Sequence, residues 1–233
     1  MITVITVNHD AHRFIELCVK AVHMHTKIPY QHMIIDNGSN PATIQMLTEF
    51  HNKGWIRLIR RNMPKMAASH AASLNWILFT PPSDLVCLLD SDAYPIRDDW
   101  LNYLIETMNT NHADATGFAH FRDESLLHPS CMLFKYAAYQ TSGKPSFSIV
   151  KRSDKFWDTA MIMCDGLRQN GHKLIPISKE KLSEYVKHRW MATRFENAKG
   201  DKIDDIPKEV YRKETEEWFN DPIAQEILKC RCC

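Results

Sequence analysis

Two aspartates that stand two residues apart, Asp90 and Asp92, have the residue type and spacing that point most directly to chemistry. They follow the apolar run 85–89, which is typical of a strand buried on both faces, and Pro95 stops the strand soon afterwards. In an extended segment such residues face the same side, so both carboxylates can converge on one target. Hard oxygen ligands beyond the end of a strand suit Mg²⁺ or Mn²⁺ that carries a substrate phosphate. The alternative is a plain turn, in which one Asp caps the next helix and the other faces solvent.

The segments that must position this pair indicate an α/β fold. Strand-like runs at 2–7, 33–35 and 55–60 alternate with helical patterns at 11–25 and 41–53. Alternation in units of roughly 30 residues is typical of a mostly parallel sheet with helices on both faces. Further helices are expected at 66–79, 100–108 and 158–170, further strands at 113–118, 130–134 and 172–177, and a strand or loop at 186–190.

The end of the chain differs in composition from the rest. Beyond Gly200 it is more charged, and Asp205-Ile206-Pro207 is typical of a helix start, with the helix reaching about Lys229. We therefore expect a single domain over 1–198 and a charged helical extension over 199–233 that ends in a Cys-rich tail. That tail, Cys230-Arg231-Cys232-Cys233, is interpreted as frayed and inert, with a shared metal or a lipid attachment as alternatives.

Composition excludes several classes of protein. The chain has 233 residues, 44% hydrophobic and 24% charged, which is ordinary for one soluble globular domain of good size. A formal net charge of +1 gives no sign of a nucleic-acid-binding surface, so no nucleic-acid partner is expected. No run approaches the ~18 apolar residues of a transmembrane segment. Most of the seven cysteines stand singly, which favours a reducing, cytoplasmic location, with peripheral attachment to a membrane left open.

Six short motifs occur in a definite order between Ile2 and Arg194. They are Thr6-Val7-Asn8, Ile35-Asp36-Asn37-Gly38-Ser39, the helix Ala68–Asn75, Leu89-Asp90-Ser91-Asp92-Ala93, Trp157-Asp158-Thr159 with Gly171 later, and His188. In this order they resemble the nucleotide-sugar-dependent glycosyltransferases of the GT-A fold, of the family 2 type. The resemblance implies a metal-dependent, inverting transfer of a hexosyl or deoxyhexosyl group. The donor would be a nucleoside-diphosphate sugar, with a UDP-sugar favoured, and the acceptor a hydroxyl of a glycan or glycoconjugate.

The resemblance also implies a role for each motif at the donor. Asp92 and His188 would hold Mn²⁺ or Mg²⁺, and imidazole suits Mn²⁺ better than Mg²⁺. Asp90 and Ser91 would face the nucleotide. Asp36 would accept a hydrogen bond from the N3–H of uracil or thymine, although a helix cap or an Asx-turn would use the same residue. Thr6, Val7 and Asn8 would line the base pocket, and Asn75 would lie beneath the nucleotide.

Asp158 is the expected catalytic base. An inverting transfer needs a carboxylate that removes the proton from the acceptor hydroxyl as it attacks. Trp157 stands where the family more commonly has Glu, and Asp158 could instead be a helix N-cap.

Other classes fit the sequence less well. A catalytically inactive sugar-nucleotide-binding domain of the same fold is one alternative. A nucleotidyltransferase of related fold is another, but the glycine-rich phosphate loop after its first strand is missing. A phosphatase of the haloacid-dehalogenase type would have its Asp pair near the N-terminus and a Thr where Ala93-Tyr94 stands.

Overall fold

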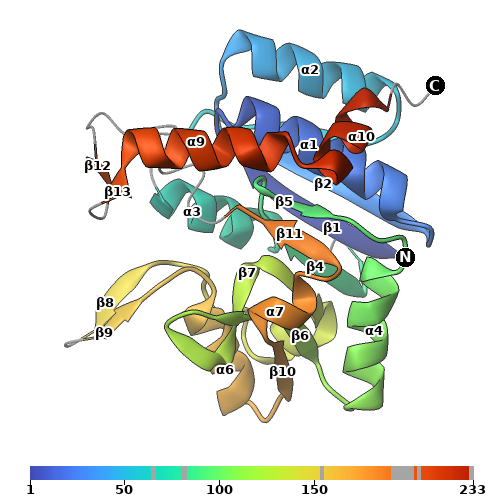
Figure 1. Cartoon of the computed structure of the whole chain (residues 1–233). Coiled ribbons are helices and arrows are strands. Elements are labelled where there is room, and N and C mark those ends of the chain that lie inside the picture. Colours follow the sequence, from blue (N-terminus) through green and yellow to red (C-terminus); the bar gives the residue numbers. More distant parts are fainter. Residues whose placement is uncertain (64–66, 80–82, 153–154, 190–201, 204–205, 231–233) are drawn as a thin grey trace.

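The computed structural model describes residues 1–63, 67–79, 83–152, 155–189, 202–203 and 206–230. Its centre is a seven-stranded sheet in the order β10-β6-β7-β4-β1-β2-β3 (Figure 1). The strands are β1 (Ile2–Asn8), β2 (Tyr30–Asp36), β3 (Arg57–Arg60), β4 (Leu85–Leu89), β6 (Ala115–His120), β7 (Asp123–Lys135) and β10 (Leu174–Ile177). All neighbouring pairs are parallel except the two that β7 makes, with β4 and β6. The predicted mostly parallel α/β sheet is therefore confirmed.

Helices cover both faces of this sheet, because successive side chains of each strand point to opposite sides. In β1, Ile2 and Val4 pack into one buried cluster, and Ile5 and Val7 into another. The first cluster contains side chains of α1 (His12–His25), α2 (Pro41–Asn52), α4 (Trp100–Thr110) and α7 (Lys179–Leu182). The second contains those of α3 (Ala67–Ile77), α5 (Tyr136–Thr141) and α6 (Met161–Gln169). No described helix is long and apolar enough to cross a lipid bilayer.

Among the described residues, three pairs of short strands lie outside the main sheet. The pair β5 (Ala93–Pro95) and β11 (Val186–His188) follows the end of β4, and its antiparallel register sets His188 opposite Ala93. The other pairs are β8 (Val150–Arg152) with β9 (Lys155–Trp157), and β12 (Lys202–Ile203) with β13 (Ile206–Pro207). The β5–β11 ribbon joins two segments that are almost a hundred residues apart in the chain.

The C-terminal extension folds against the domain as two helices, α9 (Lys208–Phe219) and α10 (Pro222–Lys229). The single helix expected from Asp205-Ile206-Pro207 is wrong in two respects. Ile206 and Pro207 form strand β13, and the helix is interrupted where Asp221 caps α10 by accepting from the backbone N–H of Ile223 and Ala224. Apolar side chains of both helices form a third buried cluster with α1 and Tyr94.

Candidate active site

The two aspartates and the late histidine meet at the carboxyl end of β4. Asp92 Oδ1 lies 3.1 Å from His188 Nε2, and Asp90 Oδ2 lies 3.9 Å from the same nitrogen. One ligand atom from each of the three residues lies within 4.8 Å of the others. An ion with ligands at about 2.1 Å would have those ligands about 3 to 4 Å apart, so the cluster is close to the size of a metal site. The geometry fits Mn²⁺, which accepts both carboxylate and imidazole ligands.

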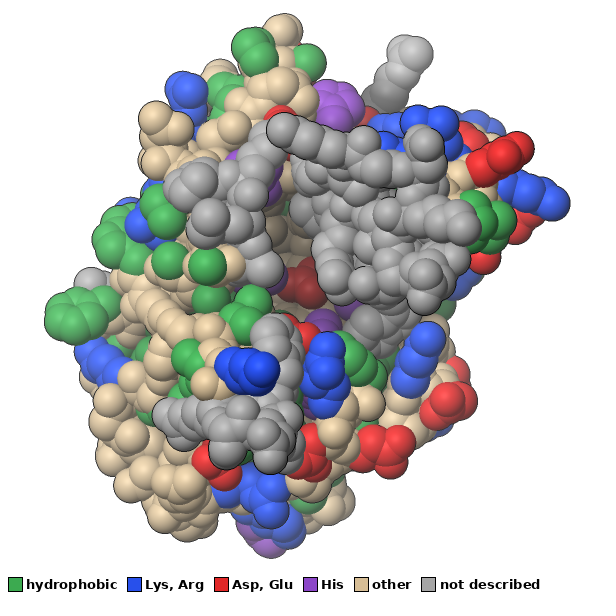
Figure 2. Space-filling view, turned by 90° about the vertical axis from the view of Figure 1, so that its left-hand side faces the viewer, with side chains coloured by type: hydrophobic (Ala, Val, Ile, Leu, Met, Phe, Trp, Pro, Cys, Tyr) green, Lys and Arg blue, Asp and Glu red, His purple; other side chains and the backbone are tan. Residues whose placement is uncertain are grey.

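Burial raises the free-energy cost of keeping the carboxylates of this cluster charged. The side chains of Asp92 and His188 are only 7% and 4% exposed, and that of Asp90 is 19% exposed. Burial raises the pKa of Asp90, the Asp92 charge raises it further, and His70 partly opposes the shift. Two buried carboxylates side by side are costly unless a cation neutralises them. On the face shown in Figure 2, acidic and histidine side chains lie at the bottom of a hollow.

The structure adds His70, a residue of the helix expected at 66–79 to which the sequence analysis gave no role. Its Nε2 lies 3.7 Å from Asp90 Oδ1, on the other side of that carboxylate from His188. A signal was available, because helices of a parallel α/β sheet begin near the carboxyl ends of the strands. His70 is in the first turn of α3, whereas Asn75 lies more than a turn further along the helix.

Two more histidines extend the cluster along the β6–β7 hairpin. The ring of His128 lies 6.0 Å from that of His188, and the ring of His120 lies 5.1 Å from that of His128. Burial lowers the pKa of both His120 and His128. Both rings are therefore neutral near pH 7. They line one side of the acidic cluster, which consists of Asp90, Asp92 and His188, and they add no charge to it.

Asp158 lies before α6, not at its cap. The helix expected to start at 158 begins at Met161, after Ala160 in a left-handed conformation (φ 68°), so the N-cap alternative for Asp158 is wrong. Its carboxylate accepts from the Thr159 N–H at 2.8 Å and lies 3.7 Å from Arg122 Nε. The side chain is 25% exposed, and its charge contributes to the raised pKa of Asp90. Asp158 therefore belongs to the same electrostatic neighbourhood as the acidic cluster.

Asp36 and Asn8 form a buried pair at the ends of β2 and β1. Asp36 Oδ1 accepts from the backbone N–H of Gly38 and Ser39, at 3.0 and 2.9 Å. Its Oδ2 accepts from Asn8 Nδ2 at 2.9 Å and from Ser39 Oγ at 2.6 Å. The Asx-turn considered from the sequence is therefore present. Asn8 Oδ1 is buried with no hydrogen-bond partner.

The remaining predicted nucleotide residues serve the fold in this structure. Thr6 is fully buried, with its hydroxyl 3.1 Å from His32 Nε2, and Val7 packs in the core. Asn75 donates to the hydroxyls of Ser146 and Ser148, and accepts from the Phe147 N–H at 2.8 Å. Ser91 is buried between the two aspartates of the cluster. Of these four residues, Ser91 alone neighbours the acidic cluster directly in the chain.

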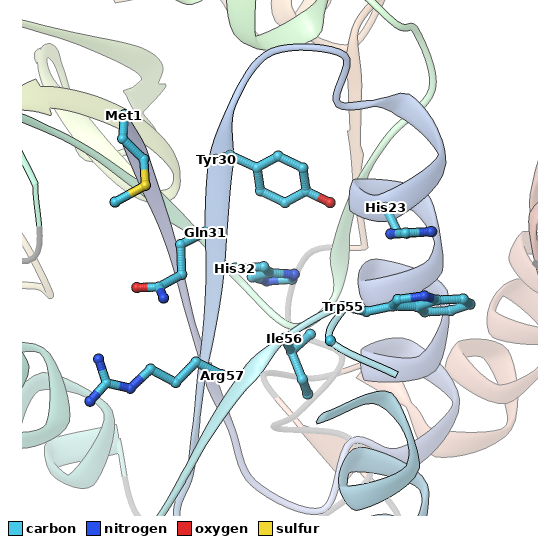
Figure 3. Close-up of a pocket in the computed structure, with 9 residues that line it drawn as sticks. Met1, His23, Tyr30, Gln31, His32, Trp55, Ile56 and Arg57 are labelled. Carbon is cyan, nitrogen blue, oxygen red and sulfur yellow. The ribbon is translucent and has the colours of Figure 1, made fainter. Parts of the chain in front are cut away.

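A separate cavity of about 430 Å³ opens at the amino ends of β1 to β3 (Figure 3). His23 and Trp55 stack there with ring centroids 4.2 Å apart. None of the residues predicted to bind donor, metal or acceptor lines this cavity. It lies at the opposite end of the strands from the acidic cluster, and it plays no part in the proposed chemistry.

Solved structures share this fold at low sequence identity. The mannosyltransferase PcManGT from Pyrobaculum calidifontis, in complex with GDP-Man and Mn²⁺, superposes with a TM-score of 0.59 and 16% identity, over 97% of this chain and 72% of that one. S. aureus TarS 1-349 in complex with UDP-GlcNAc gives 0.60 and 14%, over 97% and 71%. A further crystal structure of S. aureus TarS 1-349 gives 0.60 and 13%, over 99% and 75%. A comparison with curated protein sequences finds no match.

The family model described as "Glycosyl transferase family 2" matches residues 3–150. That range includes Asp36, Asp90 and Asp92, whereas Asp158 and His188 lie beyond it. The matched range is more than half of the chain, and the fold agrees with it. The chain belongs to glycosyl transferase family 2 and is a glycosyltransferase of the GT-A fold.

Proposed function

We propose that this protein is a metal-dependent, inverting glycosyltransferase that moves a hexosyl or deoxyhexosyl group from a nucleoside-diphosphate sugar to a hydroxyl of a glycan or glycoconjugate. The observation that carries the proposal is the meeting of Asp90, Asp92 and His188 within 4.8 Å at the carboxyl end of β4. Ligands of open α/β sheets bind at this edge. The Mn²⁺ and GDP-Man held by PcManGT, and the UDP-GlcNAc held by TarS, support the same chemistry here.

Asp92 and His188 would hold the ion, with Asp90 beside them facing the nucleotide. When bound, Mn²⁺ or Mg²⁺ neutralises the charge that develops on the leaving diphosphate. The chain's own contribution is to place two carboxylates and one imidazole in a site where burial strengthens their attraction for a cation. His70, 3.7 Å from Asp90, adds a further donor at the edge where the diphosphate would lie.

Asp158 would act as the base. As the acceptor oxygen attacks the anomeric carbon, its proton passes to the Asp158 carboxylate, and the carbon–oxygen bond to the diphosphate breaks with its electron pair on the leaving group. Attack from the face opposite the leaving group inverts the anomeric centre. Arg122 Nε lies 3.7 Å from Asp158 Oδ2, so the two side chains form an ion pair beside the acceptor position.

The base of the nucleotide would lie over the ends of β1 and β2, with a UDP-sugar as the favoured donor. Asp36 fixes the turn at Gly38 and Ser39, which borders the proposed base site. Its carboxylate can accept a hydrogen bond from a base N–H only after the Ser39 hydroxyl turns away from it. The buried Asn8 Oδ1 supplies a second acceptor beside it. Thr6 and Val7 would contribute backbone groups, Ser91 would face the nucleotide, and Asn75 would act indirectly through the segment 146–148.

Calorimetric titration with UDP, GDP and dTDP, with and without Mn²⁺, tests the donor site. We expect at least one nucleotide to bind only when Mn²⁺ is present. Asp92→Asn should abolish the metal-dependent part of binding. Asp98→Asn, which removes an exposed carboxylate on the surface, is the matched control and should bind as the wild type does. Metal-independent binding, or none, would refute the proposal.

The base and the turnover are tested with a panel of UDP- and GDP-sugars, by following hydrolysis or transfer. Asp158→Asn should reduce turnover by about 10²- to 10⁴-fold while nucleotide binding is kept. Loss of binding and turnover together would mean that Asp158 is not the base. Binding of nucleotide sugars without turnover of any of them would favour the alternative, a binding domain of the same fold.

A further inference from the structure

The two proposed metal ligands lie on the two-stranded β5–β11 ribbon, which is too short to be stable on its own. Asp92 directly precedes β5, and His188 ends β11; each of these strands has three residues. Their link is completed by the Arg189 N–H, which donates to the Asp92 carbonyl oxygen at 2.9 Å. An isolated two-stranded hairpin is at best marginally stable in water. The geometry of the site therefore depends on whatever packs against this ribbon.

Both residues that flank His188 are paired to the C-terminal helices. Lys187 Nζ lies 2.7 Å from Asp221 Oδ2, with the two side chains 26% and 29% exposed. Arg189 Nη2 donates to Glu214 Oε2 at 2.9 Å. The Arg189 guanidinium also lies 4.5 Å from the centre of the Tyr211 ring. Because Glu214 and Tyr211 belong to α9 and Asp221 caps α10, β11 is held from both sides of its histidine.

The other strand of the ribbon is held by apolar contact. Tyr94, two residues after Asp92, is buried and meets the edge of the Trp218 ring, with centroids 5.4 Å apart. The same buried cluster contains Phe219 of α9 and Ile227 of α10. Figure 1 shows α9 and α10 beside the β5–β11 ribbon, on the side away from α7. Asp92 and His188 thus each lie within two residues of a contact with the extension.

We infer that the C-terminal extension is a clamp for the metal site: Glu214 and Asp221 are positioning residues that fix Asp92 and His188 at the spacing an ion needs. The inference rests on the proposed role of those two ligands. Groups that orient metal ligands are important to affinity because a free ligand must be ordered when the ion binds. Here the ion pairs of Lys187 and Arg189, on each side of His188, order that ligand before an ion binds.

The clamp is tested by Mn²⁺ binding alone, followed by calorimetry or by the electron paramagnetic resonance of free Mn²⁺. Lys187→Met removes one ion pair and leaves the Asp221 cap of α10 intact, and Glu214→Gln removes the other. We expect the double variant to bind Mn²⁺ about fivefold to tenfold more weakly than the wild type. Lys187→Arg made alone keeps the positive charge beside Asp221 and should bind Mn²⁺ as tightly as the wild type does.

The matched control is Glu216→Gln. Glu216 is also on α9, but it pairs with Arg13 of α1 and not with the ribbon. A purely structural role of α9 predicts equal losses of Mn²⁺ affinity in the control and the double variant, and that result would refute the clamp. An affinity loss confined to the double variant supports it, as does unchanged Mn²⁺ affinity in Glu216→Gln despite a lowered melting temperature. If the wild type itself binds no Mn²⁺, the proposed metal site fails, and the clamp fails with it.

Discussion

A buried histidine far from the proposed chemistry gives the sharpest prediction of how stability depends on pH. His32 on β2 is 2% exposed, and burial lowers its pKa from 6.5 to about 3. The folded-state pKa is thus below the unfolded-state value. The contribution of neutral His32 to stability is present above pH 6.5 and is lost as the pH falls toward 3, because only the unfolded chain takes up the proton in that window.

The size of the loss follows from the two pKa values. At about pH 5 the unfolded histidine is nearly all protonated and the folded one is not, which costs ~2 kcal/mol of unfolding free energy relative to about pH 7.5. This figure hardly changes as long as the folded-state pKa of His32 is below about 4. A loss of ~2 kcal/mol is a large part of the total unfolding free energy of an ordinary domain.

Urea unfolding at about pH 7.5 and at about pH 5 measures this loss of unfolding free energy. His32→Gln keeps a polar group near the Thr6 hydroxyl but does not titrate, so its loss of stability on acidification should be ~2 kcal/mol smaller than that of the wild type. His112→Gln removes an exposed histidine and is the control, with the wild-type loss expected. Equal losses in the wild type and His32→Gln would refute the reasoning.

Further predictions concern close backbone contacts, one side-chain anchor and the metal. A Cβ on Gly117 would lie 2.2 Å from the Cys131 carbonyl oxygen, so Gly117→Ala should cost ~3 kcal/mol or more in urea unfolding. At Gly54 nothing lies within 4 Å, and Gly54→Ala should cost only ~1 kcal/mol for its positive φ. Asn75→Ala should speed hydrogen exchange at the Phe147 amide, which the Asn75 side chain now holds. Chelation by EDTA should abolish sugar transfer, and added Mn²⁺ should restore it.

Local patterns predicted the elements that carry most of the fold. The apolar run 85–89 is strand β4, and the β-branched run 2–7 lies within β1. Helix α2 begins at Pro41 as expected, because Pro41 needs no N–H partner there, and Asn40 caps the helix by accepting from the Thr43 N–H. Each of these signals lies within a few residues of the structure it predicts, which is why sequence alone was enough.

Local sequence patterns did not predict which distant segments pair with one another. Only part of the antiparallel strand β7 was expected, at 130–134, because its pairing with β4 and β6 depends on segments many residues away. The ribbon that sets His188 beside Asp92 is likewise a contact across almost a hundred residues. Ion pairs such as Lys187 with Asp221 leave no local pattern at all. The sequence therefore named ligand types, whereas the tertiary structure decides whether they meet.

Asp36 and Asp158 show why residue type alone cannot assign a role. Both are carboxylates in turns, but Asp36 is fully buried and accepts four hydrogen bonds, whereas Asp158 is 25% exposed and accepts one from a backbone N–H. A carboxylate has about four acceptor sites, so Asp36 has none left for a proton from substrate, while Asp158 does.

The difference predicts that the same substitution costs more stability at Asp36 than at Asp158. Asp36→Asn must turn its NH₂ toward either the Gly38 and Ser39 N–H groups or the Asn8 amide, so it should cost ~1–3 kcal/mol of stability. Asp158→Asn changes only partly exposed contacts, with the Thr159 N–H and Arg122, and should cost under ~1 kcal/mol. Urea unfolding of the two variants makes the comparison. If Asp36→Asn proved as stable as Asp158→Asn, hydrogen-bond count would not separate the carboxylate that builds a turn from the one that is available to take a proton.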